Sequence, residues 1–216
     1  MSASFDRLAN SYEMIERVSF GAKLQRMREH GLLAFRNRPN GRALLLGDGN
    51  GRFSSATLAR NPALSIDSID SSARMLELAA KRINDSVPNS ANRYRTIHAN
   101  ALDEDFGVCR YDFIAIQFFL DCFPERTANR LVQRIEASLK PGGRLIYTDF
   151  AIPNVQPWQT ISRFILFALY RFFRATTAIK VRQLPYIHWP NTLELVSQRE
   201  SLKGMLIGEI RAKAEP

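Results

Sequence analysis

Three glycines separated by single residues follow a short apolar run, and this pattern can form a ligand-binding turn. The predicted strand Ala43–Gly47 leads into the sequence Gly47-Asp48-Gly49-Asn50-Gly51. Glycine lets the backbone turn tightly and approach a ligand without a Cβ clash. A dinucleotide-binding turn has the spacing GxGxxG, and Arg52 stands where its third glycine would be. The spacing therefore argues against a nicotinamide dinucleotide, and a plain tight turn is the alternative.

A carboxylate ends the next apolar run, and its position suits contact with a ribose. Asp70 lies 19 residues after Gly51, at the end of the predicted strand 64–70. In open α/β sheets an acid at this place accepts hydrogen bonds from ribose hydroxyls. The alternative is that Asp70 caps the following helix, where Ser71 and Ser72 also offer cap oxygens. Asp67 is a rival acid, but it lies inside the strand.

The elements that must position these residues alternate between strands and helices. Strands are predicted at 43–47, 64–70, 94–100, 111–117 and 145–150, and helices at 53–60, 71–82 and 124–139. Lys140-Pro141-Gly142-Gly143 stops the last of these helices, and 205–212 is predicted as a final, antiparallel strand. Such alternation predicts an α/β fold, with a parallel sheet covered by helices on both faces.

The segments before and after this core do not alternate in this way and are predicted to be mainly helical. The first 40 residues are predicted to be helical, and 192–198 is predicted as a short helix. A longer aromatic helix is predicted at 158–173, with basic residues at Arg163, Arg171 and Arg174 and an apolar stripe of Ile161, Phe164, Ile165, Ala168 and Phe172. Three interpretations stand: a lid over an apolar acceptor, a helix lying on an anionic membrane, or a helix packed on the sheet or in a dimer interface.

Five segments, taken in order, resemble class I S-adenosylmethionine (SAM)-dependent methyltransferases. They are LLLGDGNGRF (44–53), IDSSARMLELAAKR (69–82), HANALDEDF (98–106), YDFIAIQFFLDCF (111–123) and LKPGGRLIYTDF (139–150). The resemblance covers about residues 5–152. The lead FDRLANSYEMIERVSFG also resembles ubiquinone/menaquinone-type methyltransferases, which implies a lid over the SAM pocket.

The resemblance implies a Rossmann-like α/β domain with a mostly parallel, seven-stranded sheet. The single domain 1–216 would divide into an N-terminal helical lid (1–40), a SAM-binding core (41–152), an aromatic helical insertion that caps the acceptor (153–200), and a last strand with its tail (201–216). The activity implied is transfer of a methyl group from SAM, which leaves as S-adenosylhomocysteine, to a small and apolar acceptor.

The resemblance also assigns cofactor contacts. Gly47, Gly49 and Gly51 would pass beneath the methionyl part of SAM, and Asp70 would bind both ribose hydroxyls. The other contacts expected from it are Tyr12 near the methionine end, Ser71 or Met75 against the adenine, Asn100 with Ala101 at the adenine amino group, and Gln117 and Phe118 at the sulfonium and substrate.

Two positions depart from the family's pattern. The family commonly has an acid two residues before the first glycine, where this chain has Leu45. Asp48 can replace that charge near the amino group of SAM, or it can lie on the surface. Asn100 stands where the family usually has Asp, and its carbonyl oxygen can still accept a hydrogen bond. These departures keep open a non-catalytic scaffold on the same fold.

Asp121, which follows the fourth strand, is the predicted general base if the acceptor must lose a proton. The alternative for Asp121 is a loop acid that caps the helix after Pro124. Tyr12, His98 and Tyr186 are rival bases, although His98 inside a strand is predicted to be structural; His188 lines the acceptor site or is exposed. The segment Gln117–Leu120 has no Asn-Pro-Pro-Tyr-like tetrad, which favours an oxygen, carbon or sulfur acceptor.

Charge and composition narrow the partners. The net charge is +9, yet residues 43–154 hold 13 Lys+Arg and 13 Asp+Glu, so the flanks carry the whole excess. Basic flanks suit an anionic partner, which could be an anionic substrate, a membrane surface or nucleic acid, as in an RNA methyltransferase; a solvated surface is the alternative. No nucleic-acid signature appears, and Cys109 and Cys122 lack zinc-ligand spacing and are predicted to be buried thiols. We expect no metal site, a cytoplasmic protein, and a monomer or homodimer.

Overall fold

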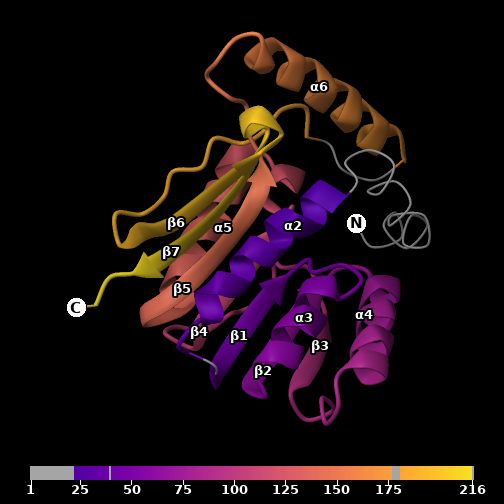
Figure 1. Ribbon diagram of the computed structural model, residues 1–216, viewed down its shortest axis with the longest axis vertical. Coiled ribbons are helices and arrows are strands. Elements are labelled where there is room, and N and C mark those ends of the chain that lie inside the picture. The colour runs from indigo at the N-terminus through magenta and orange to yellow at the C-terminus, as the bar shows by residue number, and fades with distance from the viewer. Residues whose placement is uncertain (1–21, 39, 177–180, 216) are drawn as a thin grey trace.

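The computed structural model describes residues 22–38, 40–176 and 181–215, and these form one seven-stranded sheet with helices on both faces (Figure 1). The strands are β1 (Asn40–Leu46), β2 (Ala63–Asp70), β3 (Tyr94–His98), β4 (Tyr111–Gln117), β5 (Leu139–Phe150), β6 (Leu193–Ser201) and β7 (Leu206–Lys213). Their order is β3-β2-β1-β4-β5-β7-β6. The first five strands are parallel and β7 is antiparallel to β5, as the sequence predicted, and β7 also pairs antiparallel with β6.

One predicted element is wrong. Residues 192–198 were expected to form a short helix, but Leu193–Ser201 is the edge strand β6, paired antiparallel with β7. Leu and Glu are good helix formers, but such intrinsic preferences are small in energy, and pairing with a neighbouring strand overrides them. Residues 193–200 therefore belong to the sheet and not to the helical insertion predicted at 153–200.

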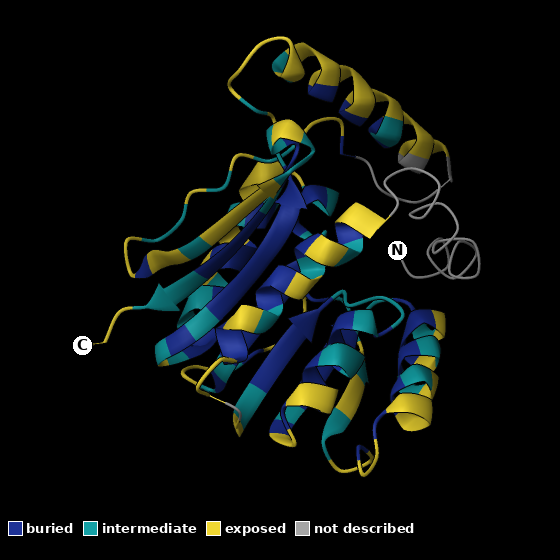
Figure 2. Ribbon diagram, in the orientation of Figure 1, coloured by how far each residue is buried: buried dark blue, intermediate teal, exposed yellow. Residues whose placement is uncertain are grey.

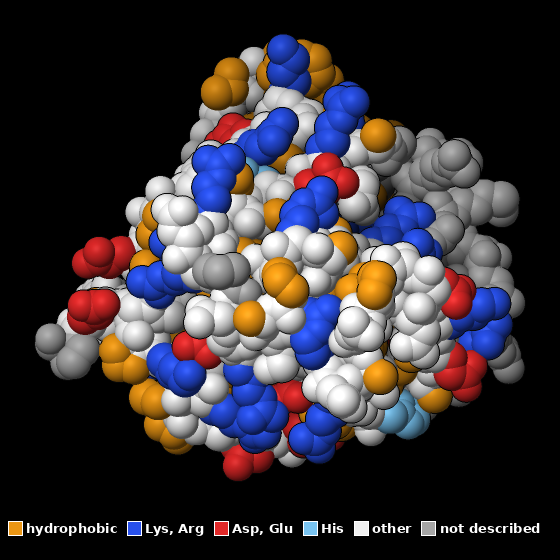
Figure 3. Space-filling model, turned by 60° about the horizontal axis from the view of Figure 1, so that its bottom comes forward, with side chains coloured by type: hydrophobic (Ala, Val, Ile, Leu, Met, Phe, Trp, Pro, Cys, Tyr) orange, Lys and Arg blue, Asp and Glu red, His pale blue; other side chains and the backbone are white. Residues whose placement is uncertain are grey.

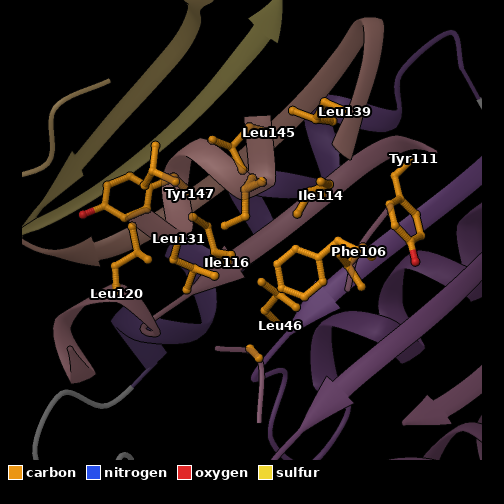
Figure 4. Close-up of a cluster of buried hydrophobic side chains, with 14 of the residues drawn as sticks. Leu46, Phe106, Tyr111, Ile114, Ile116, Leu120, Leu131, Leu139, Leu145 and Tyr147 are labelled. Atoms are coloured by element: carbon orange, nitrogen blue, oxygen red, sulfur yellow. The ribbon is translucent and has the colours of Figure 1, made fainter. Parts of the chain in front are cut away.

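Alternate residues of the strands fill two separate cores, one on each face of the sheet. Leu44 and Leu46 of β1 point into the core covered by α5 (Glu125–Ser138), which also contains Ile114 and Leu131. Figure 4 shows Leu46, Ile114 and Leu131 in this core. Leu45 points the other way, toward Phe35 and Phe53. This alternation is the period-2 pattern of strands that are buried on both faces.

The helices that connect the parallel strands follow the prediction closely. α3 covers Arg52–Arg60 and α4 covers Ala73–Ser86, and α5 ends at Ser138, one residue before β5 begins. Lys140-Pro141-Gly142-Gly143 therefore lies within the first part of β5. Of the two cysteines, Cys109 is exposed and only Cys122 is partly buried, so the expectation of two buried thiols is wrong for Cys109.

Two further helices complete the fold: one packs on the face of the sheet, and the other lies at the carboxyl-end edge of its strands. The helix α2 (Ala22–His30) continues into a 3₁₀ turn at Gly31–Phe35, and it buries Leu24 and Met27. The helix α6 (Trp158–Thr176) lies across that edge, with most of its surface exposed (Figure 2). Among the described residues, no helix is both long enough and apolar enough to cross a membrane.

Candidate functional site

The edge at the carboxyl ends of β1, β2 and β4 gathers most of the residues predicted to bind SAM. β1 pairs with β2 on one side and with β4 on the other, and the chain reverses its direction of winding between these two neighbours. Ligands of open α/β sheets bind outside the strand ends at such a switch point. The glycine turn leaves β1 here, Asp70 ends β2, and Gln117 ends β4.

The three glycines of the turn have positive φ angles but different surroundings. A methyl group on Gly47 would lie 2.5 Å from the ring of Phe119, and one on Gly51 would lie 2.7 Å from the Cα atom of Ala79 in α4. A methyl group on Gly49 would have nothing within 4 Å. Gly47 and Gly51 thus permit close packing within the protein, whereas Gly49 alone borders open space where a ligand could approach.

Asp48 caps the helix that follows the turn, which corrects the surface position considered for it. Its Oδ2 atom accepts hydrogen bonds from the Ser54 amide, at 3.1 Å, and from the Ser54 hydroxyl. The N-cap residue Gly51 has no side chain for this task, so Asp48 satisfies an amide in the first turn of α3. Burial raises the pKa of Asp48 to about 6, although the Ser54 hydrogen bonds and Arg28 oppose that shift.

Asp70 lies at the strand end where a ribose-binding acid is expected, and it also organises the start of α4. Its Oδ1 atom accepts a 2.9 Å hydrogen bond from the Ser72 amide. Ser72, and not Ser71, is the N-cap of α4, because its hydroxyl accepts from the Met75 amide at 3.1 Å. His98 pairs with Asp70 across β2 and β3, and its Nε2 atom lies 3.1 Å from the Ser71 carbonyl oxygen. The two alternatives for Asp70, capping and ribose binding, are thus compatible.

The predicted adenine side is built from turns. Asn100 accepts a hydrogen bond from the Leu102 amide at 3.1 Å and donates one to Asp103 Oδ2 at 2.7 Å. Both ends of its amide therefore stabilise the turn after β3. Ala101 and Met75 are buried, so their side chains serve packing as well as any contact with a base. The carboxylate of Asp103 lies beside Asn100, where the family usually has an acid.

Gln117 and Phe118 connect the end of β4 to α2. The Gln117 Nε2 atom donates to the Arg28 carbonyl oxygen at 3.2 Å, and the Arg28 guanidinium lies 4.9 Å from the centre of the Phe118 ring. The Gln117 Oε1 atom is buried and has no hydrogen-bond partner among the described residues. An unsatisfied buried acceptor is costly, so a donor from a bound ligand would stabilise it.

Asp121 is buried and pairs with a second buried carboxylate, Asp149 of β5. The Asp121 amide donates a 3.2 Å hydrogen bond to Asp149 Oδ2, and the Phe150 amide donates to Asp149 Oδ1 at 2.9 Å. The expectation that Asp121 caps the helix after Pro124 is wrong, because α5 has Pro124 as its N-cap residue and no side-chain cap. Asp121 instead lies within a 3₁₀ turn, Leu120–Cys122.

Burial changes the protonation of this pair. It raises the pKa of Asp121 to about 6, and burial together with the negative charge of Asp121 raises the pKa of Asp149 well above its usual range. Each carboxyl therefore retains its proton to a higher pH than an exposed aspartate would. Tyr170 of α6 lies within the same electrostatic environment, its hydroxyl is buried, and burial raises its pKa.

An apolar cluster flanks Phe118 and Tyr170. Leu24 and Met27 of α2 pack there with Phe150 of β5 and with residues of α6 and β7. The rings of Phe118 and Phe150 lie 5.5 Å apart. The cluster therefore joins the end of β4 to α6. It lies toward β5 and β7, whereas Asp70 lies on the other side of the switch point, at the end of β2.

The structure does not place the remaining candidate residues from the sequence at the carboxyl ends of β1, β2 and β4. Tyr12 is outside the described residues. His188 and Tyr186 are exposed, with their rings 4.8 Å apart, and the Asn129 side chain of α5 accepts from the His188 amide. Asp67 is buried in β2, where it binds Arg42 and the Tyr111 hydroxyl, so it is structural. Leu45 is buried in the core.

Sequence reasoning missed Arg28, Phe119, Asp149 and Tyr170. Asp149 had a detectable signal, because it is an acid inside a strongly apolar strand, and a buried acid needs a reason. Arg28 and Tyr170 come from helices whose facing sides depend on tertiary packing, and no local pattern points to them. Within the described residues, no group of three or more His, Cys, Asp or Glu side chains could hold a metal ion.

The residues at the switch point fit an adenosyl sulfonium ligand. Open space borders Gly49, a carboxylate lies at Asp70, and the Gln117 Oε1 atom offers an acceptor that the described residues leave unused. Asp48 and Asn100 are engaged in local hydrogen bonds, so any contact they make with the ligand would add to those bonds.

Known proteins share this architecture and these motifs. Residues 44–145 match a family described as a methyltransferase domain. The chain is 31% identical over 172 residues to a ubiquinone/menaquinone biosynthesis C-methyltransferase of Geotalea daltonii, covering 78% of this chain and 67% of the relative. It is 29% identical to a demethylmenaquinone methyltransferase of Thermotoga maritima, covering 70% of this chain and 62% of the relative.

Solved structures show the same fold. An O-methyltransferase family protein from Burkholderia thailandensis superposes with a TM-score of 0.67 at 19% identity, covering 92% of this chain but only 59% of the other. An N-methyltransferase from Bradyrhizobium japonicum, in complex with S-adenosylhomocysteine, gives a TM-score of 0.60 at 14% identity, covering 89% of each chain. The sequence relatives and the ordered motifs together show that this chain belongs to the class I SAM-dependent methyltransferase family.

Proposed function

We propose that the protein transfers a methyl group from SAM to a small apolar acceptor. The observation that carries this proposal is the convergence at one switch point of the sheet of the Gly49 turn, Asp70 and the Gln117 Oε1 atom, which has no partner in the described part of the chain. SAM, when bound, supplies an activated methyl group, and the protein's task is to align an acceptor with it. Gly49, Asp70 and Gln117 would hold the cofactor.

The acceptor side is apolar and adjoins the buried carboxyl pair. Phe118 and Phe150 line this side together with Leu24 and Tyr170. The two relatives named above act, by their names, on quinone precursors, and one is a C-methyltransferase. We therefore propose a hydroxylated aromatic ring as acceptor and a ring carbon as the atom that is methylated.

Methylation of a ring carbon requires a proton to leave the acceptor, because the carbon becomes nucleophilic when a ring hydroxyl ionises. Asp121 is our candidate to accept that proton, because burial raises its pKa to about 6. A base whose pKa lies close to the working pH is the most effective. With SAM bound, the ring carbon would take the methyl group, and the proton that this carbon carries would then pass to the ionised ring oxygen as the aromatic ring is restored.

Two measurements test these steps separately. Calorimetry should show binding of SAM and S-adenosylhomocysteine to the folded protein; no binding at millimolar ligand would contradict the proposal and favour a non-catalytic scaffold. The rate of radioactive methyl transfer from SAM to hydroxylated naphthalene and benzene acceptors should be lower in Asp121→Asn by about a hundredfold or more. Asp85→Asn, an exposed acid on α4, is the matched control.

RNA is the acceptor that the basic flanks would also suit. Figure 3 shows Lys and Arg side chains dispersed over one face, with Asp and Glu between them, and not gathered into a single stripe. A nucleic-acid interface usually presents such a stripe. Steep, salt-dependent binding of RNA together with methyl transfer to it would replace the small-molecule acceptor.

A further inference from the structure

Most of the large apolar side chains that the described residues expose lie on α6 and the loop before it. Of 13 such side chains, eight fall between positions 152 and 172: Ile152, Val155, Trp158, Ile161, Phe164, Ile165, Phe167 and Phe172. Single exposed apolar residues are normal, but a large contiguous group of them marks an interaction site. Figure 2 shows that the outer side of α6 is exposed along its length.

The apolar stripe predicted for this helix is not the side that packs on the protein. The buried positions of α6 are Ser162, Leu166 and Tyr170, which follow one another at intervals of four residues. Ile161, Ile165 and Phe164 belong to the predicted stripe and are exposed. Phe164 and Phe167 point furthest from the protein, with 73% and 63% of their surface exposed.

Positive charge accompanies these side chains. Arg163, Arg171 and Arg174 are exposed on α6, and Lys203 lies 5.8 Å from the ring of Trp158. The segment from Phe150 to Leu193 contains no Asp or Glu. The helix thus presents aromatic side chains and arginines together, without an acidic neighbour along its own length. This composition complements a surface that is apolar inside and anionic outside.

We propose that α6 docks the protein onto an anionic lipid surface. Phe164 and Phe167 would enter the boundary between headgroups and acyl chains, and Arg163, Arg171 and Arg174 would meet lipid phosphates. A second copy of the chain is the less favourable occupant, because a symmetric contact through α6 would bring like charges together. The proposal does not depend on methyl transfer.

Vesicle co-sedimentation of the full chain tests this docking. Vesicles of phosphatidylcholine with phosphatidylglycerol should bind the protein, and binding should weaken with added salt and with vesicles of phosphatidylcholine alone. Phe164→Ser with Phe167→Ser should weaken binding at least tenfold. Arg171→Gln with Arg174→Gln should weaken it about 25-fold, since each arginine near the surface contributes about fivefold.

Matched variants separate this surface from general effects. Val108→Ser with Leu195→Ser removes two exposed apolar side chains elsewhere, and Arg126→Gln with Arg130→Gln removes two exposed charges of α5. Neither control should change vesicle binding by more than about twofold. No binding to anionic vesicles would overturn the proposal, as would a dimer in ultracentrifugation that the Phe164 and Phe167 substitutions dissociate.

Discussion

The Gly47 amide donates a 2.9 Å hydrogen bond to the carbonyl oxygen of Ile69, the residue before Asp70. The glycine turn and the strand-end carboxylate therefore start side by side, although 23 positions separate Gly47 from Asp70. The parallel register of β1 and β2, with Leu46 opposite Ile69, fixes this arrangement. A crossover helix between two parallel strands is what brings such residues to the same edge.

Asp70 should contribute strongly to SAM affinity. We expect Asp70→Ala to weaken binding by about tenfold or more, because a lost charge-assisted hydrogen bond costs about 1.5–3 kcal/mol. Asp70→Asn keeps an acceptor for the Ser72 amide and so separates helix capping from ligand binding. Titration calorimetry measures both, with Asp85→Ala as the control; equal affinities for Asp70→Ala and wild type would remove Asp70 from the site.

Gly51 and Gly49 should respond differently to the same substitution. Gly51→Ala places a methyl group 2.7 Å from Ala79 and also keeps a positive φ, so it should lower the free energy of unfolding by about 2–5 kcal/mol. Gly49→Ala meets no neighbour and should cost only about 1–2 kcal/mol, through its φ. Urea denaturation of both variants measures these costs, and similar values would contradict the packing role of Gly51.

Asn100 and Asp103 should be coupled. In the wild type, Asp103 Oδ2 lies 2.7 Å from the Asn100 side-chain nitrogen that donates to it. Asn100→Asp replaces this donor by a second carboxylate. Repulsion between the two carboxylates should lower stability by about 1 kcal/mol or less at this partly exposed turn. Asp103→Asn should restore it in the double variant. A thermal-unfolding cycle at low salt checks this, and additive effects would mean that the two side chains act independently.

The sheet could be predicted because its signals are local. Leu44 and Leu45 lie in a continuous apolar run, which marks a strand buried on both faces, and helix stripes such as Leu131–Ile135 recur between such runs. The glycine turn and Asp70 could be placed for the same reason, since each follows a strand directly. Resemblance added the expectation of seven strands, and the structure confirms it.

What could not be predicted depends on contacts between distant parts of the chain. β6 became a strand only because β7 pairs with it. The hydrophobic stripe of α6 gave no indication that Leu166 and Tyr170 would pack inward while Phe164 stayed exposed, since both sides of the helix carry apolar residues. Asp149 lies 28 positions after Asp121 in the sequence, and only the fold brings its carboxylate to the Asp121 amide.

The Asp121–Asp149 pair should make stability depend on pH. Both pKa values are raised in the folded state, so the folded protein retains protons that the unfolded chain releases as pH rises above about 3.8. The free energy of unfolding therefore falls between about pH 4 and the folded-state values, beginning with the pKa of Asp121 at about 6. The stabilising effect of keeping these carboxyls protonated is present at low pH and is lost on ionisation.

Asp121→Asn removes this charge, so it should raise the free energy of unfolding more at high pH than at low pH. Relative to wild type, we expect the variant to gain about 2 kcal/mol in unfolding free energy between pH 4 and pH 7, because folding raises the pKa of Asp121 from 3.8 to about 6. Urea denaturation across that range measures the difference, and Asp85→Asn should show none because that acid is exposed. A gain that is constant with pH would show that the pKa of Asp121 is not raised in the folded protein, and its role as the base would then lose its physical support.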